Sequence, residues 1–261
     1  MPTTSADPTQ GLIWPALLLL VIVAGILLLI ALGWMYFKHR RIHSLTGMQQ
    51  RLQLATIEVD QASSEKVLEQ LAGFELYHAA HWQLQQLYEG AANDGGEGAL
   101  RVIDLRGDPF SKMDNAEIRV TVVMLSLPEL DLPKFIVVPK NFWTRTFATG
   151  AANDIQFGDA FSRHNTLVSS DPMLVRQLFN LPVRNVLRIN KDMTIEGRGD
   201  TLLLYRFPQT MNGLCISTAV QLGLDLTQVW DARAKSCSRN CASLDICPSC
   251  GDIHPAVSFI I

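Results

Sequence analysis

The stretch EIRVTVVMLSL, residues 117–127, decides the fold class of this chain. From Ile118 to Met124 every second residue is apolar, and Arg119 and Thr121 stand between them. Successive side chains of a strand point to opposite faces of a sheet. The alternation therefore predicts a β-strand with one buried face.

Apolar segments on both sides of this stretch predict more strands. Residues 100–105 and 134–138 are rich in valine, isoleucine and leucine, and turn-forming glycines and prolines separate them from the central stretch. Residues 193–196 and 201–207 flank the tetrapeptide Gly-Arg-Gly-Asp. This last pattern predicts a β-hairpin.

Helices are predicted around these strands. Residues 172–180 follow Asp171 with a proline at the start, and residues 183–189 and 212–233 carry apolar residues at helical spacing. A further helix is expected to begin after Ser63 or Ser64, because serine is a favoured N-cap residue. The sequence thus predicts an α+β domain over residues 65–233, with a mainly antiparallel sheet and flanking helices.

An uncharged apolar run, residues 12–37, precedes this domain and ends in Lys38-His39-Arg40-Arg41. A membrane core needs roughly 20 apolar helical residues. A cleaved signal peptide would carry a basic N-terminal region, but residues 1–10 contain no lysine or arginine. The run therefore predicts one retained transmembrane helix, with the lipid bilayer as the first partner.

The basic residues after the run predict the orientation of the chain. Positive side chains stay on the cytoplasmic side of a membrane, so residues 1–11 form a short external tail. Residues 38–64 read as a juxtamembrane helical stalk, and everything beyond residue 38 is expected in the cytoplasm. The formal net charge of −3 and the absence of a basic stripe exclude nucleic acid as a partner.

A cysteine cluster follows the predicted domain, in a tail over residues 234–261. Cys237, Cys241, Cys247 and Cys250 could hold a metal ion as four thiolates, and His254 could replace one ligand. Two zinc-binding cysteine pairs are usually separated by roughly 12–20 residues. Here only five residues separate Cys241 from Cys247. Structural zinc, an iron–sulfur or redox pair, and cysteines that bind no metal all remain open.

Other local patterns have simpler explanations. A metal site on a helix would show the HExxH pattern, which is not present around Glu75, His78 and His81. We therefore expect these three residues on an ordinary short helix. Two Arg-Gly-Asp triplets, at residues 106–108 and 198–200, are expected in tight turns. Cys215 is expected in the core, and Trp82, Trp143 and Trp230 are expected as packing anchors.

The order of segments resembles a family of uncharacterised bacterial membrane-anchored proteins, in which a hydrophobic N-terminal segment precedes an α+β domain. The resemblance covers roughly residues 70–230. It rests on DLPKF (131–135) with Val138-Pro139, on DIQF (154–157) with Phe161-Ser162, Asp171, Val175-Arg176 and Leu178-Phe179, and on IEG (195–197) with DTLLLYR (200–206). It implies the bacterial inner membrane as the location and supplies no activity, and the cysteine tail departs from the family pattern.

Three functions are compatible with these features. The first is a membrane-tethered interaction or scaffold module that binds a protein partner. The second is a zinc-binding sensor or regulator that uses the tail cysteines. The third is a membrane-proximal enzyme, which is disfavoured because no nucleophile elbow, P-loop or dinucleotide-binding motif is present.

Overall fold

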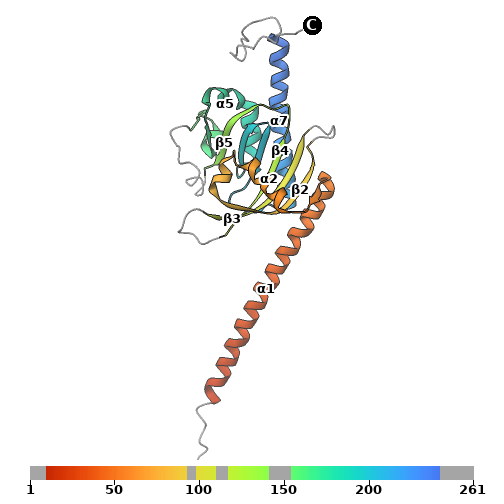
Figure 1. Cartoon of the computed structure of the whole chain (residues 1–261). Helices are drawn as coiled ribbons and strands as arrows, with labels where there is room; N and C mark the ends of the chain where they lie inside the picture. The colour runs from red at the N-terminus through yellow and green to blue at the C-terminus, as the bar shows by residue number, and fades with distance from the viewer. Residues whose placement is uncertain (1–9, 93–97, 110–116, 141–153, 242–261) are drawn as a thin grey trace, which may run out of the picture. The chain divides into compact units, whose positions relative to one another are not determined.

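A computed structural model describes residues 10–92, 98–109, 117–140 and 154–241 of the chain (Figure 1). The side chains of residues 10–17, 34, 36–40, 42, 109 and 231–241 lie outside that description. The chain divides into two compact units, residues 1–47 and residues 48–261. Each unit is described by itself.

The first unit is built on helix α1, which runs from Gln10 to Leu52 and so continues into the second unit. Its apolar side chains are exposed along the helix, for example Leu18 at 65% and Leu29 at 69%. Within the described part of the chain, no helix meets the length and apolar character needed to cross a membrane.

The second unit is organised around one antiparallel sheet. Among the described residues eight strands pair in the order β1-β2-β3-β4-β8-β7-β5-β6. The strands are β1 (Ala55–Ile57), β2 (Ala80–Ala91), β3 (Ala99–Pro109), β4 (Ile118–Ser126), β5 (Leu132–Pro139), β6 (Asn165–Ser169), β7 (Thr194–Gly199) and β8 (Thr201–Tyr205). A register shift between Leu84 and Gln86 marks an irregularity in the pairing of β2 with β3.

The described residues of the second unit also form helices, several of which begin with a polar side chain that caps the first turn. They are α2 (Gln61–Leu71), the 3-10 helix η1 (Glu75–Ala79), α4 (Ala160–His164), α5 (Pro172–Leu178), α6 (Leu181–Ile189) and the long α7 (Gly213–Cys241). The side chains of Asp60, Asp159, Asp171 and Asn180 each accept the backbone N–H three residues later. These bonds satisfy donors that the helix leaves without a partner.

Helices cover both faces of the sheet, as Figure 1 shows. Val67 and Leu71 of α2 belong to a core that includes Met124 of β4. Helix α7 packs on β4 and β8 and comes close to Leu125, the next residue along β4. Neighbouring residues of a strand point to opposite faces, so β4 is buried on both sides.

This double burial corrects the expectation of one buried face for residues 118–124. Thr121 is fully buried, and its hydroxyl donates to the Asp104 carboxylate over 2.5 Å. The same hydroxyl accepts the Met211 N–H over 3.0 Å. These two bonds offset the cost of burying polar atoms beneath α7.

Two aromatic rings lie directly over glycines of neighbouring strands. Trp82 pairs with Gly107 across β2 and β3, and Phe135 pairs with Gly197 across β5 and β7. A Cβ atom on Gly107 would lie 2.6 Å from the Trp82 ring, and one on Gly197 would lie 2.3 Å from the Phe135 ring. Only glycine leaves room for these rings against the sheet.

Most of the predicted secondary structure is confirmed. The antiparallel sheet with flanking helices is present, and strands occupy the segments predicted at 100–105, 117–127 and 134–138. Residues 193–207 form the predicted hairpin of β7 and β8, and the helices predicted at 172–180 and 183–189 are α5 and α6.

The segment before the domain differs from the prediction. The helix expected to continue through residues 38–64 ends at Leu52, and β1 follows it. The N-cap of α2 is Asp60 and neither Ser63 nor Ser64, and the Ser63 hydroxyl accepts the Asp60 N–H in return. Strand β2 was not predicted, and its first residues include His81, which was expected on a helix.

Candidate interaction site

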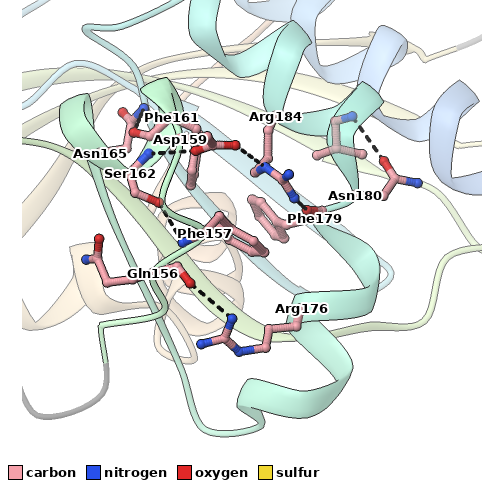
Figure 2. A network of polar contacts seen from close by, with 11 residues as sticks. Gln156, Phe157, Asp159, Phe161, Ser162, Asn165, Arg176, Phe179, Asn180 and Arg184 are labelled. Atoms are coloured by element: carbon pink, nitrogen blue, oxygen red, sulfur yellow. Dashed lines mark hydrogen bonds and ion pairs between the residues drawn. The ribbon is translucent and has the colours of Figure 1, made fainter.

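A polar network lies where the segment before α4 meets α5 and α6. Figure 2 shows Phe157 between two arginines, Arg176 of α5 and Arg184 of α6. The guanidinium carbon of Arg184 lies 4.3 Å from the centre of the Phe157 ring, and that of Arg176 lies 5.7 Å away. Both distances fall within the range of cation–π attraction.

Arg184 is held from two further directions. Its Nε donates to the Asp159 carboxylate over 2.6 Å, and its Nη1 donates to the Phe179 carbonyl over 2.6 Å. Partial burial acts against the charge of Asp159, but hydrogen bonds from Arg184 and from the Ser162 N–H outweigh it and lower the pKa of Asp159. Asp159 is therefore an ionised carboxylate, which caps α4 and fixes Arg184.

Arg176 closes the other side of the network and is exposed. Its Nη1 donates to the Gln156 carbonyl over 3.0 Å, and the Phe157 N–H donates to the Ser162 hydroxyl over 2.9 Å. These bonds hold the backbone of residues 156 and 157 against α4 and α5. An exposed guanidinium in a fixed position can bind a carboxylate through two parallel hydrogen bonds.

Apolar side chains on α5 and α6 are exposed next to these arginines. Val183 and Leu187 of α6 are buried in the core, yet Leu181 is 58% exposed and Ile189 is 80% exposed. Met173 of α5 is 74% exposed. We define the α5–α6 surface by its exposed residues Met173, Leu174, Arg176, Leu181, Arg188 and Ile189.

A second polar cluster is buried under η1. The Glu196 carboxylate accepts the Glu75 N–H over 2.6 Å, the Leu76 N–H over 3.0 Å and the Tyr205 hydroxyl over 2.6 Å. Burial is the strongest influence and raises the pKa of Glu196, although these hydrogen bonds oppose it. Burial also raises the pKa of Tyr205 well above its usual value, and the neighbouring Glu196 carboxylate adds to this effect.

Contacts around this cluster support a structural role for Glu196. Lys134 forms an ion pair with the Glu75 side chain over 2.8 Å, and Arg198 donates to the Gly73 carbonyl over 3.0 Å. The three hydrogen-bond donors to Glu196 are two backbone N–H groups of η1 and the Tyr205 hydroxyl. The cluster therefore attaches η1 to β7 and β8, and its carboxylate already has partners on both oxygens.

The predicted metal ligands fall mostly outside the described residues. Cys247, Cys250 and His254 lie beyond residue 241, and the side chains of Cys237 and Cys241 are likewise outside the description. The backbone at Cys237 and Cys241 belongs to α7, which extends past its predicted end at residue 233. In the described part of the chain, no group of three or more candidate ligands is arranged to hold a metal.

The Glu75, His78 and His81 pattern does not form one helix face. Glu75 and His78 lie on η1, whereas His81 is an exposed residue of β2. The ring of His78 packs edge-on against Tyr77, with 5.7 Å between ring centres. The expectation of a single short helix is wrong, because the chain changes to an extended conformation at Ala80.

The other predicted features have mixed outcomes. The triplet at residues 198–200 covers the last two residues of β7 and the turn residue before β8, but the triplet at residues 106–108 lies within β3. Cys215 is only half-buried instead of in the core. Trp82 and Trp230 are buried packing residues, as predicted, and Trp143 lies outside the described residues.

Sequence reasoning missed Glu196 and the Phe157 network. One local signal was present for Glu196. It is a charged residue that directly follows Ile195 in a segment predicted to be a strand. No local signal indicated that Arg176 and Arg184 flank Phe157, because the three residues come from separate elements.

Comparison with known proteins finds no matching family model, no matching curated protein and no matching solved structure. The resemblance to bacterial membrane-anchored proteins therefore stays a prediction.

Proposed function

We propose that this protein is a single-pass membrane protein whose folded unit acts as a cytoplasmic interaction module. The observation that carries the proposal is the exposed apolar surface of α1. Every large apolar side chain described between Leu18 and Leu32 is exposed, from 47% at Val23 to 69% at Leu29. Soluble proteins rarely leave so large an apolar surface in water.

The sequence extends this surface in both directions. Residues 12–17 and 34–37 add uncharged residues on either side, and the helix is continuous from Gln10 to Leu52. A run of that length spans a bilayer core about 30 Å thick. Lys38, Arg40 and Arg41 follow it, which supports an external N-terminus and a cytoplasmic folded unit in the bacterial inner membrane.

An interaction role suits the folded unit better than catalysis. Glu196 and Tyr205, a deeply buried titratable pair, are engaged in holding η1. Arg176 and Met173 of the α5–α6 surface are residue types that protein interfaces favour. A tethered module would bring its partner to the membrane.

Membrane anchoring can be tested by extraction of the full chain from native membranes at alkaline pH. We expect the wild-type protein to remain in the membrane pellet and to be released only by detergent. The double variant Ile26→Arg/Leu29→Arg should be recovered in the soluble fraction, since each arginine at the centre of a span costs about 3 kcal/mol.

The matched control is Met173→Arg, which places an arginine at an exposed apolar position of the folded unit. It should stay in the pellet. Release of the wild-type protein by alkaline extraction would contradict the anchor. Orientation follows from protease digestion of sealed vesicles, and protection of the folded unit in vesicles with the cytoplasmic face outward would contradict the proposed topology.

A zinc-binding regulator is a second candidate, and the extent of α7 favours it. Cys237 and Cys241 are four residues apart in one continuous helix, and residues at this spacing share a helix face. Cys247-Pro-Ser-Cys250-Gly would supply the second pair after a short connection.

Metal analysis of the full chain, purified in detergent under reducing conditions, tests this candidate. We expect about one zinc ion per chain, and loss of that zinc in the Cys247→Ser/Cys250→Ser variant. Cys215→Ser is the control, because Cys215 is a half-buried cysteine near the start of α7. Zinc-free and iron-free protein would exclude the site, and iron in place of zinc would assign it to redox chemistry.

A further inference from the structure

We propose that the α5–α6 surface binds a protein segment that carries carboxylates beside apolar side chains. The inference rests on the proposed interaction function and adds the chemistry of the partner.

The apolar part of the surface is not needed by the fold. Helix α6 is in contact with α4 and α7, and it buries Val183 and Leu187. Leu181 and Ile189, at its two ends, remain largely exposed, and so does Met173 on α5. With Leu174, four exposed apolar side chains on two consecutive helices offer area that a partner could bury at about 25 cal/mol per Å².

The charge around these side chains favours an acidic partner. Arg176, Arg188, Lys191 and, on α4, Arg163 are exposed basic residues. The exposed acids nearby are Asp171 and Asp192, and Asp171 already accepts the Leu174 N–H as the cap of α5. The surface therefore has a positive balance, although the whole chain has a net charge of −3.

Arg176 distinguishes a protein carboxylate from a lipid headgroup as the partner. Its guanidinium is positioned by the Gln156 carbonyl and by the Phe157 ring, which Arg184 holds from the other side. A pre-positioned planar guanidinium loses little freedom on binding, so it favours directional, bidentate contact with a carboxylate. Contact with mobile headgroups gains little from such positioning. An acidic protein segment is the occupant that fits.

Photo-crosslinking of the full chain in native membranes tests the surface. A photoreactive residue replaces Met173, Leu181 or, as the control, Leu214, which is 72% exposed on α7. We expect positions 173 and 181 to crosslink to the same protein segment, in which aspartate and glutamate outnumber lysine and arginine. Position 214 should not capture that segment.

Charge reversal gives the second arm of the experiment. Arg176→Glu/Arg188→Glu should reduce the crosslink at position 181 by about tenfold or more, because two charge-assisted contacts become repulsive. Arg163→Glu, on α4, should reduce it less. Retention of every variant in the membrane pellet shows that the anchor is intact, and a single cooperative thermal transition shows that the folded unit is intact, so failure here is separable from failure of the anchor.

The other occupants of the surface are outcomes that overturn the proposal. An adduct with a second copy of this chain would make it a self-association surface. An adduct with lipid would assign it to the membrane. The absence of any adduct at positions 173 and 181, or an adduct unaffected by charge reversal, would equally overturn it.

Discussion

The Tyr205 hydroxyl donates to the Glu196 carboxylate over 2.6 Å, and both residues are almost completely buried. They belong to the two strands of the β7–β8 hairpin. The same carboxylate accepts two backbone N–H groups of η1, from residues 120 and 121 positions earlier in the chain. Glu196 therefore joins a segment at the start of the folded unit to a hairpin near its end.

Removal of the Tyr205 hydroxyl should destabilise the folded unit. Tyr205→Phe leaves a buried carboxylate with one donor fewer, which costs about 1–3 kcal/mol of the free energy of unfolding. Urea denaturation of the full chain in detergent measures the change. Tyr88→Phe is the control, because the Tyr88 hydroxyl donates to the exposed side chain of Gln86 and should matter less. Equal losses in both variants would contradict a special role for Tyr205.

The raised pKa of Glu196 predicts a pH dependence of stability. The folded state holds this proton more tightly than the unfolded state, for which the usual pKa is 4.5. The contribution of Glu196 is therefore fully present below about pH 4.5 and is lost as pH rises through the raised pKa. Glu196→Gln should remove this component, so stability of the variant relative to wild type should increase as pH rises. A difference that does not change with pH would refute the prediction.

Asp159 predicts the opposite pH dependence. Its pKa is lowered, so its contribution is present above the usual value of 3.8 and is lost as pH falls through the lowered pKa. Asp159→Asn keeps a good N-cap for α4 but removes the charge that faces Arg184. We expect a loss of about 1 kcal/mol at neutral pH and a smaller loss in acid, measured by urea denaturation. The control is Asp171→Asn. Asp171 caps α5 in the same way, but its role in the network involves no arginine.

Gly197→Ala should be destabilising because its Cβ would meet the Phe135 ring at 2.3 Å. Phe135 also packs edge-on against Phe179 and Trp230, so its ring has little room to move. We expect a loss of about 1–3 kcal/mol in the free energy of unfolding. The double variant Gly197→Ala/Phe135→Leu should lose less than the sum of the single variants, and strict additivity would show that the two sites are independent.

Local patterns were sufficient for those elements that bury residues at a regular spacing. The alternation in residues 118–124 predicted β4, and the Gly-Arg-Gly-Asp turn predicted the β7–β8 hairpin. The second buried face of β4 was not predictable from that stretch alone. It depends on α7, which begins about 90 residues later, as the bond from Met211 to Thr121 shows.

Strand β2 shows how an irregularity hides a strand. Ala80, Trp82 and Leu84 alternate with polar residues, but the register shift between Leu84 and Gln86 moves the next buried residue to Leu87. The period of two is therefore interrupted in the middle of the strand. The Phe157 network was hidden for a different reason, because its residues come from separate elements that only the tertiary structure brings together.

That irregularity also bears on solubility. The short strand β1 pairs only with Leu87–Glu89 of β2, the longest strand described. Among the described strands, the first half of β2 therefore forms an edge of the sheet. An open edge is a template on which other chains can add strands and aggregate. A register shift at Leu84 and the exposed polar side chains of His81 and Gln83 make this edge a poor template. The feature that conceals β2 from sequence analysis is thus also one that natural proteins use against strand addition at a sheet edge.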